Sequence, residues 1–197
     1  MGFATTLLLT ALLVLPVQAQ SRFDRATNIG QVDSIRSATL NEYRPFLVYT
    51  PPSYSDTTVV SARYPVLYLL DGYEHFHAVS GLIQALGTGV NGTFAIPEMI
   101  VVAIPNVGPH RTRDLTPTSA TRGADGAERP DQAASGGDPA FLDFISNELI
   151  PHIDVAYRTM PYRAFVAHSL GGITTLNALY TMPETFDAYV AIDPRSM

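Results

Sequence analysis

The stretch "FVAHSLGGITTL", residues 165–176, decides how the chain is expected to fold. An apolar run ends at His168, Ser169 follows, and Gly171 opens a segment with apolar residues at helical spacing. This order predicts a buried strand, a tight turn that carries the serine at its tip, and then a helix. Such a turn is typical of a nucleophilic serine, yet no histidine follows Ser169 in the sequence to act as its base.

The residues around Ser169 fit this turn with one departure. A strained strand–serine–helix turn needs small residues two positions before and after the serine, because neighbouring backbone passes close by. Gly171 meets the requirement, and Ala167 stands where the usual pattern has glycine. The start of the helix leaves the backbone amide of Leu170 free to donate to an oxyanion. The local pattern leaves open the alternative that Ser169 only caps the helix.

The rest of the chain alternates between predicted strands and helices. Four apolar runs are typical of strands buried on both faces: 64–72, 97–106, 164–169 and 188–194. Helical spacing marks 78–87, 139–153 and the segment after Ser169, with Asp138 as the expected N-cap of the second helix. Two extended segments, 31–38 and 42–50, come first. We therefore predict an α/β fold with a mostly parallel sheet, helices on both faces and an antiparallel edge.

Composition restricts the class of protein. The 197 residues carry a net charge of −6 with no basic run, which disfavours nucleic acid or an anionic membrane surface as a partner. Hydrophobic residues make up 46%, enough for one packed domain over residues 20–197. The absence of cysteine excludes disulfides, thiol catalysis and zinc–thiolate sites. A polar stretch rich in Gly, Pro and Ala, at about 116–138, is expected to be a flexible insertion.

The first 19 residues have the pattern of a secretory signal peptide. An apolar run from Phe3 to Leu15 is followed by Val17-Gln18-Ala19, whose small residues suit a signal peptidase. The run is shorter than the about 20 residues that a membrane-spanning helix needs. We therefore expect a secreted or periplasmic protein without a membrane span.

A second oxyanion donor is expected in "YLLDGYEHF", residues 68–76. In serine hydrolases with this kind of turn, one donor comes from the loop after an earlier strand. The backbone amide of Tyr73 is the candidate, because it follows the Asp-Gly pair that ends a predicted buried strand. An ordinary strand-ending turn is the alternative for this segment.

The histidines provide no convincing base. His168 is adjacent to Ser169, so its side chain would point elsewhere, and we expect it to pack structurally. His75 and His77 are expected on the wall of the site, and without a third ligand nearby in sequence they do not predict a metal site. His152 falls near a helix end, where a positive charge suits the helix dipole.

Cationic residues follow the second predicted buried strand. His110, Arg111 and Arg113 fall at the edge of the sheet where open α/β folds bind ligands. Attraction of an anionic substrate and an ion pair with Asp114 explain these residues equally well.

Several segments together resemble the esterase family of α/β-hydrolases, which includes enterochelin and other siderophore esterases, S-formylglutathione hydrolases, feruloyl esterases and mycolyltransferases. They are "YPVLYLLDG", "IVVAIPN" followed by "RTRDLTPT", "FLDFISNELIPHID" and "AHSLGG", in the family's order and spacing over roughly residues 40–195. The enterochelin-esterase branch is the most similar. The resemblance implies Ser169 as nucleophile, the amides of Tyr73 and Leu170 as oxyanion donors, a small-molecule ester as substrate, and no cofactor or metal.

The acid and the base of the expected triad are missing. In α/β-hydrolases both follow the serine along the chain, but the 28 residues after Ser169 offer only Glu184, Asp187 and Asp193 as acids and no histidine. We therefore expect a C-terminally truncated form that lacks the last strands and leaves an uncovered apolar edge at 188–192.

The functional prediction follows from this incomplete set of groups. Without a base, the hydroxyl of Ser169 is a poor nucleophile. The sequence predicts a serine ester hydrolase that acts through an acyl-Ser169 intermediate and is inactive or weak as this chain. An acyltransferase is a close variant, and a non-catalytic, ligand-binding pseudo-esterase is the alternative.

Overall fold

The computed structural model describes residues 28–89, 92, 94–119, 121–122, 126–130 and 133–195. The expected signal peptide and parts of the expected insertion lie outside these residues.

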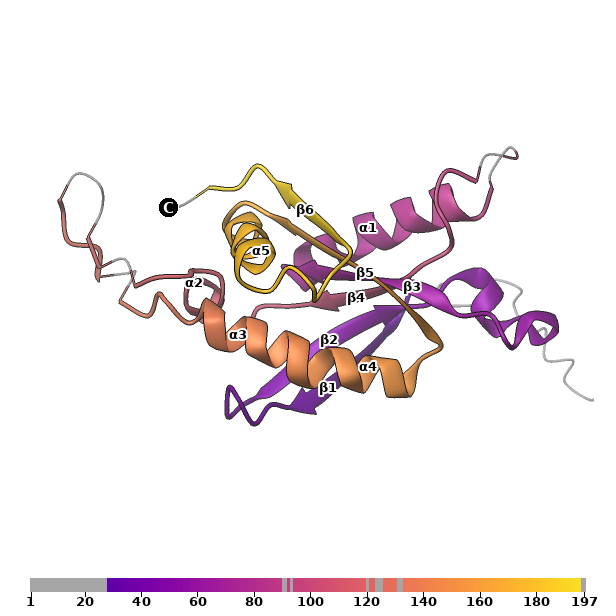
Figure 1. The fold of residues 1–197 in the computed structure, drawn as a ribbon, viewed down its shortest axis with the longest axis horizontal. Helices are drawn as coiled ribbons and strands as arrows, with labels where there is room; N and C mark the ends of the chain where they lie inside the picture. Colours follow the sequence, from indigo (N-terminus) through magenta and orange to yellow (C-terminus); the bar gives the residue numbers. More distant parts are fainter. Residues whose placement is uncertain are drawn as a thin grey trace, which may run out of the picture.

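The described residues form one six-stranded sheet (Figure 1). The strand order is β1-β2-β4-β3-β5-β6, and the strands are β1 (Gln31–Arg36), β2 (Tyr43–Tyr49), β3 (Tyr64–Leu70), β4 (Ile100–Ile104), β5 (Thr159–His168) and β6 (Ala188–Ile192). β4, β3, β5 and β6 are parallel to one another, whereas β1 and β2 are antiparallel to their neighbours. The mostly parallel sheet with an antiparallel N-terminal edge is thus confirmed.

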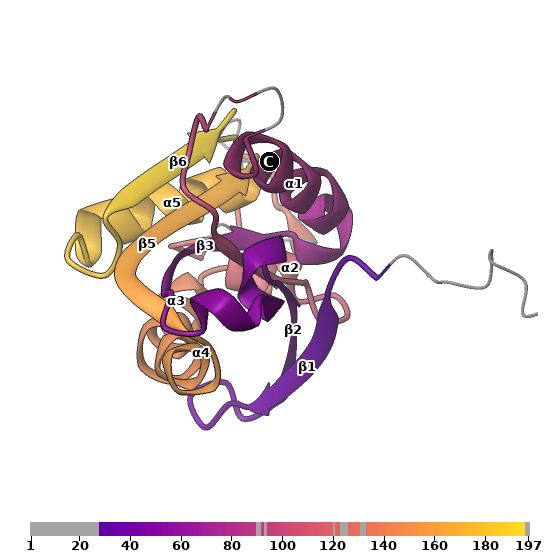
Figure 2. The same ribbon diagram turned by 90° about the vertical axis from the view of Figure 1, so that its right-hand side faces the viewer.

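Helices cover both faces of the sheet, as Figure 2 shows. α1 (Gly72–Gly87) packs on one face; α3 (Asp138–Phe144), α4 (Ile150–Ala156) and α5 (Leu170–Thr181) pack on the other. The short α2 (Arg111–Asp114) and the 3₁₀ turns η1 (Pro52–Ser55) and η2 (Thr57–Val59) lie in connections. α1 leaves β3 toward one face and α5 leaves β5 toward the other. The carboxyl ends of these adjacent strands therefore form a crevice where such sheets bind ligands.

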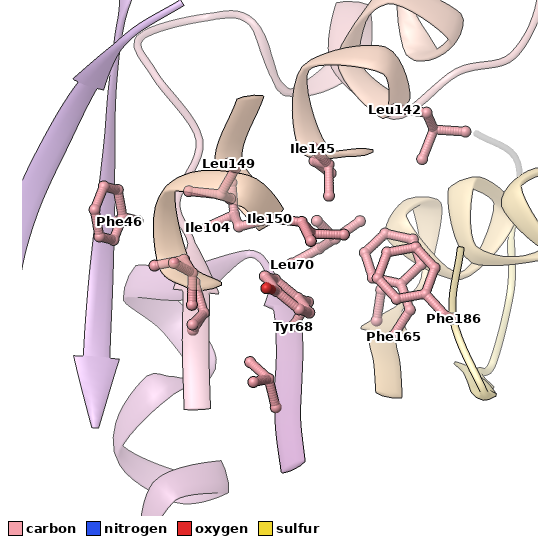
Figure 3. Close-up of a cluster of buried hydrophobic side chains, with 14 of the residues drawn as sticks. Phe46, Tyr68, Leu70, Ile104, Leu142, Ile145, Leu149, Ile150, Phe165 and Phe186 are labelled. Carbon is pink, nitrogen blue, oxygen red and sulfur yellow. The ribbon is translucent and has the colours of Figure 1, made fainter. Parts of the chain in front are cut away.

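Alternating side chains of the central strands build the two halves of the core. All of β3 is buried: Tyr68 and Leu70 face α3–α5, while Leu67 and Leu69 face α1. Figure 3 shows the larger half, in which Phe165 stacks on Phe186 with ring centroids 4.6 Å apart. Burial on both faces explains why these strands read as continuous apolar runs.

Two helices differ from the prediction. α1 begins at Gly72 rather than at residue 78, because Asp71 has left-handed backbone angles that reverse the chain directly after β3. The predicted helix over 139–153 extends from Asp138 to Ala156 and contains one π turn, η5 (Ile145–Leu149). The π turn ends at Leu149, two residues before Pro151. Proline has no amide hydrogen, and its ring crowds the preceding helical turn, so the regular α-helical hydrogen bonds are interrupted there.

The prediction of Asp138 as an N-cap is wrong. Gly137 occupies the cap position, and Asp138 is the first helical residue. The carboxyl group is instead fully buried against α5, where it accepts a hydrogen bond from Asn177. A tertiary contact therefore outweighs the local preference of aspartate for the N-cap position.

The two ends of the expected insertion meet at Thr116. Gly136 donates its amide to the Thr116 hydroxyl at 2.7 Å, and Asp138 donates its amide to the Thr116 carbonyl at 3.2 Å. The flexibility expected between these ends stays a prediction.

β6 presents the apolar edge expected from the sequence. Its outer edge pairs with no strand among the described residues, and Val190 and Ile192 are 44% and 49% exposed. None of the described helices is long and apolar enough to cross a bilayer.

Candidate active site

Ser169 lies at the tip of the turn between β5 and α5. Its φ of 55° and ψ of −122° are strained for a residue with a side chain. Its amide donates to the Ile192 carbonyl and its carbonyl accepts from Gly172, both at 2.9 Å. The side chain is half-buried and makes no capping hydrogen bond, so the helix-cap alternative is wrong.

Close packing explains the small residues around the turn. A Cβ atom added to Gly171 would lie 2.9 Å from Cβ of Ala167, too close for two carbon atoms. The methyl group of Ala167 is accommodated because the facing position is glycine. The same Cβ would lie 3.6 Å from Oδ2 of Asp71, which places the serine turn directly beside the turn that follows β3.

The turn after β3 is the second element of the site. The Asp71 carbonyl accepts from the amides of Glu74 and His75, which closes the first turn of α1. Gly72 packs against the end of β4, where an added Cβ would lie 2.8 Å from the Pro105 nitrogen. Tyr73 therefore belongs to the first helical turn.

The amides of Tyr73 and Leu170 are free to donate. Neither has a hydrogen-bond acceptor among the described residues, as expected of amides in the first turn of a helix. The two segments that carry these amides meet at the contact between Gly171 and Asp71. The Leu170 amide directly follows the half-buried Ser169, and the Tyr73 amide lies in the first turn of α1, at the carboxyl ends of β5 and β3.

The carboxylate of Asp71 is fixed by three hydrogen bonds. Arg111 donates from Nε and Nη2 at 2.7 and 2.9 Å, and Asn106 donates from Nδ2 at 2.7 Å. Burial raises the pKa of this carboxyl group, but the hydrogen bonds from Arg111 and Asn106 outweigh burial and lower the pKa overall. We therefore treat Asp71 as ionised at neutral pH. Local sequence patterns do not mark this side chain as part of the site, although "LLDG", "IPN" and "RTRD" contribute Asp71, Asn106 and Arg111.

The cationic residues after β4 take different partners. Arg113 pairs with Glu42 and with Asp114, each at 2.6 Å, as the ion-pair alternative predicts. Arg111 pairs with Asp71 instead. Asp114 also binds Arg44, which is buried and lies over the ring of Phe141. This network, missed in the sequence, connects β2 and α2 with α3.

The histidines lie around the site and beyond it. His75 and His168 pack edge to face with ring centroids 6.0 Å apart, so His168 has the packing contact that was expected. His77 lines a pocket of about 320 Å³ together with Tyr73. His152 lies away from these residues, against the ring of Phe46.

The strand order and the serine turn define an α/β-hydrolase fold. The sequence model of the family described as "Putative esterase" matches residues 37–194. The chain therefore belongs to this esterase family.

Individual relatives support the same assignment. The chain is 33% identical over 163 residues to the ferri-bacillibactin esterase BesA of Bacillus subtilis, covering 78% of this chain and 55% of the relative. It is 29% identical over 170 residues to the siderophore triacetylfusarinine C esterase of Aspergillus fumigatus, covering 76% and 51%. An IroE-like serine hydrolase from Shewanella oneidensis superposes with a TM-score of 0.76 at 36% identity, covering 82% of this chain and 49% of the other. The chain thus spans about half the length of these relatives.

Proposed function

We propose that the protein is a serine ester hydrolase with Ser169 as its nucleophile. The Ser169 oxygen attacks the ester carbonyl carbon, the alcohol leaves with a proton, and water then cleaves the acyl-Ser169 intermediate. The amides of Tyr73 and Leu170 donate to the carbonyl oxygen as it becomes negatively charged. The observation that carries this proposal is the strained turn of Ser169, which lies beside the Asp71 turn at the carboxyl ends of β3 and β5.

The proposed substrates are siderophore esters. The relatives that match most of this chain are named as esterases of ferri-bacillibactin and of triacetylfusarinine C. A secreted or periplasmic location, proposed from the first 19 residues, suits a protein that acts on such small molecules.

The proposed activity of this chain is weak. Residues 170–197 contain no histidine, so these residues alone provide no base in the usual position. Oxyanion donors and binding alone leave roughly 10³–10⁴-fold acceleration over water in serine hydrolases that have lost their triad. The second candidate, which the sequence pattern left open, is a pseudo-esterase that binds an ester without turnover.

Hydrolysis of p-nitrophenyl acetate by the parent, Ser169→Ala and Ser55→Ala separates these functions. Ser55 is exposed and lies in η1, so its substitution serves as a matched control. We expect slow hydrolysis and an acyl group on Ser169, detected by mass spectrometry, in the parent and the control only. A rate that survives Ser169→Ala would contradict the hydrolase. Saturable binding of enterobactin without any turnover would establish the pseudo-esterase.

A further inference from the structure

Asp71 contacts both halves of the candidate site. Its backbone leads directly into the turn that carries the Tyr73 amide, and its Oδ2 atom lies beside Gly171 in the serine turn. We propose that Asp71, held by Arg111 and Asn106, is a positioning residue that aims the Tyr73 amide at the substrate oxygen. This inference rests on the proposed function. The three side chains are called the Asp71 clamp below.

The backbone of Asp71 needs support to keep its conformation. Its φ of 52° and ψ of 50° fall in the left-handed region, which residues with a Cβ atom rarely occupy. Because Tyr73 is only two residues further along the chain, rotation at Asp71 would redirect its amide. The conformation at Asp71 therefore sets the direction in which Tyr73 donates.

The Asp71 clamp joins three elements around that backbone. Asp71 follows β3, Asn106 follows β4, and Arg111 begins α2. The parallel register pairs Leu70 with Ile104, so Asp71 and Asn106 leave the sheet side by side. The carboxylate is 4% exposed, which limits competition from water for its hydrogen bonds.

The other ion pairs at this end of the sheet do not have this arrangement. Arg113, two residues from Arg111, binds Glu42 and Asp114, and among the described residues it forms no ion pair with Asp71. Removing either arginine deletes one positive charge and breaks one ion-pair network. Only the loss of Arg111 removes the ion pair that holds Asp71, the residue before Gly72 and Tyr73. The two arginines therefore form a matched pair for a test.

The weak activity proposed for this chain makes the test sensitive. When residues 1–197 are assayed without a base from elsewhere, the remaining acceleration comes from the oxyanion donors and from binding. Loss of one such donor lowers kcat about 10²–10³-fold in a complete enzyme, so a displaced donor is expected to lower kcat by about tenfold. Substrate binding does not require the oxyanion, so KM should stay within about twofold.

The experiment compares the parent with Asp71→Gly, Asp71→Asn, Arg111→Met and Arg113→Met. Asp71→Gly removes the carboxylate, but glycine still adopts left-handed backbone angles. Asp71→Asn also tolerates these angles, and its side-chain oxygen can still accept a hydrogen bond from Arg111. The readouts are the Ser169-dependent kcat and KM for p-nitrophenyl acetate and the NMR order parameter of the Tyr73 amide. We expect Asp71→Gly and Arg111→Met to lose kcat and to lower the order parameter from about 0.85 to below about 0.6. Asp71→Asn should recover part of both, and Arg113→Met should change neither.

The two readouts separate failure of this inference from failure of the proposed function. Unchanged kcat and an ordered Tyr73 amide in Asp71→Gly and Arg111→Met would overturn the positioning role. Equal effects of Arg111→Met and Arg113→Met would also overturn it, because general destabilisation would then explain both. A parent without Ser169-dependent hydrolysis would contradict the hydrolase, and the order parameter would then decide the positioning role alone.

Discussion

The side-chain amide of Asn177 on α5 donates to Oδ2 of Asp138 on α3 at 2.6 Å, and the carboxyl group has no exposed surface. The second oxygen of Asp138 and the hydroxyl of Thr174 are also buried at this contact. Burial raises the pKa of Asp138 to about 6, and the negative charge of Asp114 adds to the effect. The contact between α3 and α5 therefore contains a carboxyl group with a pKa of about 6.

Asp138 should make the protein less stable as the pH rises from about 4 to about 6. The folded protein keeps this proton to a higher pH than the unfolded chain does, so the stability that it contributes is lost as the pH passes through the folded pKa. A rise from 3.8 to about 6 corresponds to a loss on the order of 3 kcal/mol. Asp138→Asn should be more stable than the parent at pH 7.5 and similar to it near pH 4, measured by urea unfolding.

Asp143→Asn is the control for this titration. Asp143 lies on the same helix and is exposed, so its loss should leave the pH dependence of the parent unchanged. Asp71 and Glu42, whose pKa values are lowered, destabilise the fold only at lower pH and are present in every variant. A parent and an Asp138→Asn variant with parallel pH profiles would show that the buried carboxyl group has an ordinary pKa.

Gly72→Ala should destabilise the protein by about 1–3 kcal/mol, the usual effect of overpacking. The added Cβ would meet only backbone atoms of β4 and of the residue that follows it, 2.8 Å from the Pro105 nitrogen and 2.9 Å from the Ile104 carbonyl carbon. These atoms belong to the central sheet and cannot move aside. Gly81→Ala in the same helix is the matched control, because nothing lies within 4 Å of its added Cβ. It should stabilise the protein by about 0.5–1 kcal/mol. Urea midpoints that fall equally in both variants would contradict the packing argument.

Arg44→Met should cost about 3 kcal/mol in the free energy of unfolding. Arg44 is 1% exposed and binds the equally buried Asp114 at 2.8 Å, so methionine fills the volume but leaves a buried carboxylate with fewer cations. Arg36→Met is the control, because Arg36 is exposed on β1 and should change stability by no more than about 0.5 kcal/mol. Chemical denaturation would measure both variants, and a loss at position 44 no larger than at position 36 would contradict a structural role for the ion pair.

The sequence predicted the sheet because burial on both faces leaves a local signature. β3 and the inner part of β5 must be apolar at consecutive positions, so their runs could be recognised without any knowledge of their neighbours. The start of α1 was predicted six residues late. Its first turn contains Tyr73, Glu74 and His75, which have no helical pattern, and the helix begins where it does because of the backbone of Asp71.

The position of Ser169 was predictable for the same local reason, but the surroundings of the site were not. Asp71 and Arg111 are 40 residues apart in sequence, and Asp138 and Asn177 are 39 apart. Each pair forms only after the sheet has brought separate connections together. Local patterns instead favoured Asp71 as a turn residue and Asp138 as a helix cap, since both are ordinary roles of aspartate.

Ser169→Gly should make the protein more stable than Ser169→Ala does. Both substitutions remove the hydroxyl, but only glycine adopts a φ of 55° with a ψ of −122° without strain. Such strain costs about 1–3 kcal/mol, and the greater freedom of glycine in the unfolded chain offsets about 0.5–1 kcal/mol of the gain. We therefore expect the glycine variant to exceed the alanine variant by about 1 kcal/mol in urea unfolding at pH 7. Gly92→Ala, at a φ of 79° with open space around it, should likewise make alanine less stable than glycine and serves as a positive control. If the glycine variant were no more stable than the alanine variant, the turn at Ser169 would not be strained. The main structural argument for Ser169 as a nucleophile would then fail.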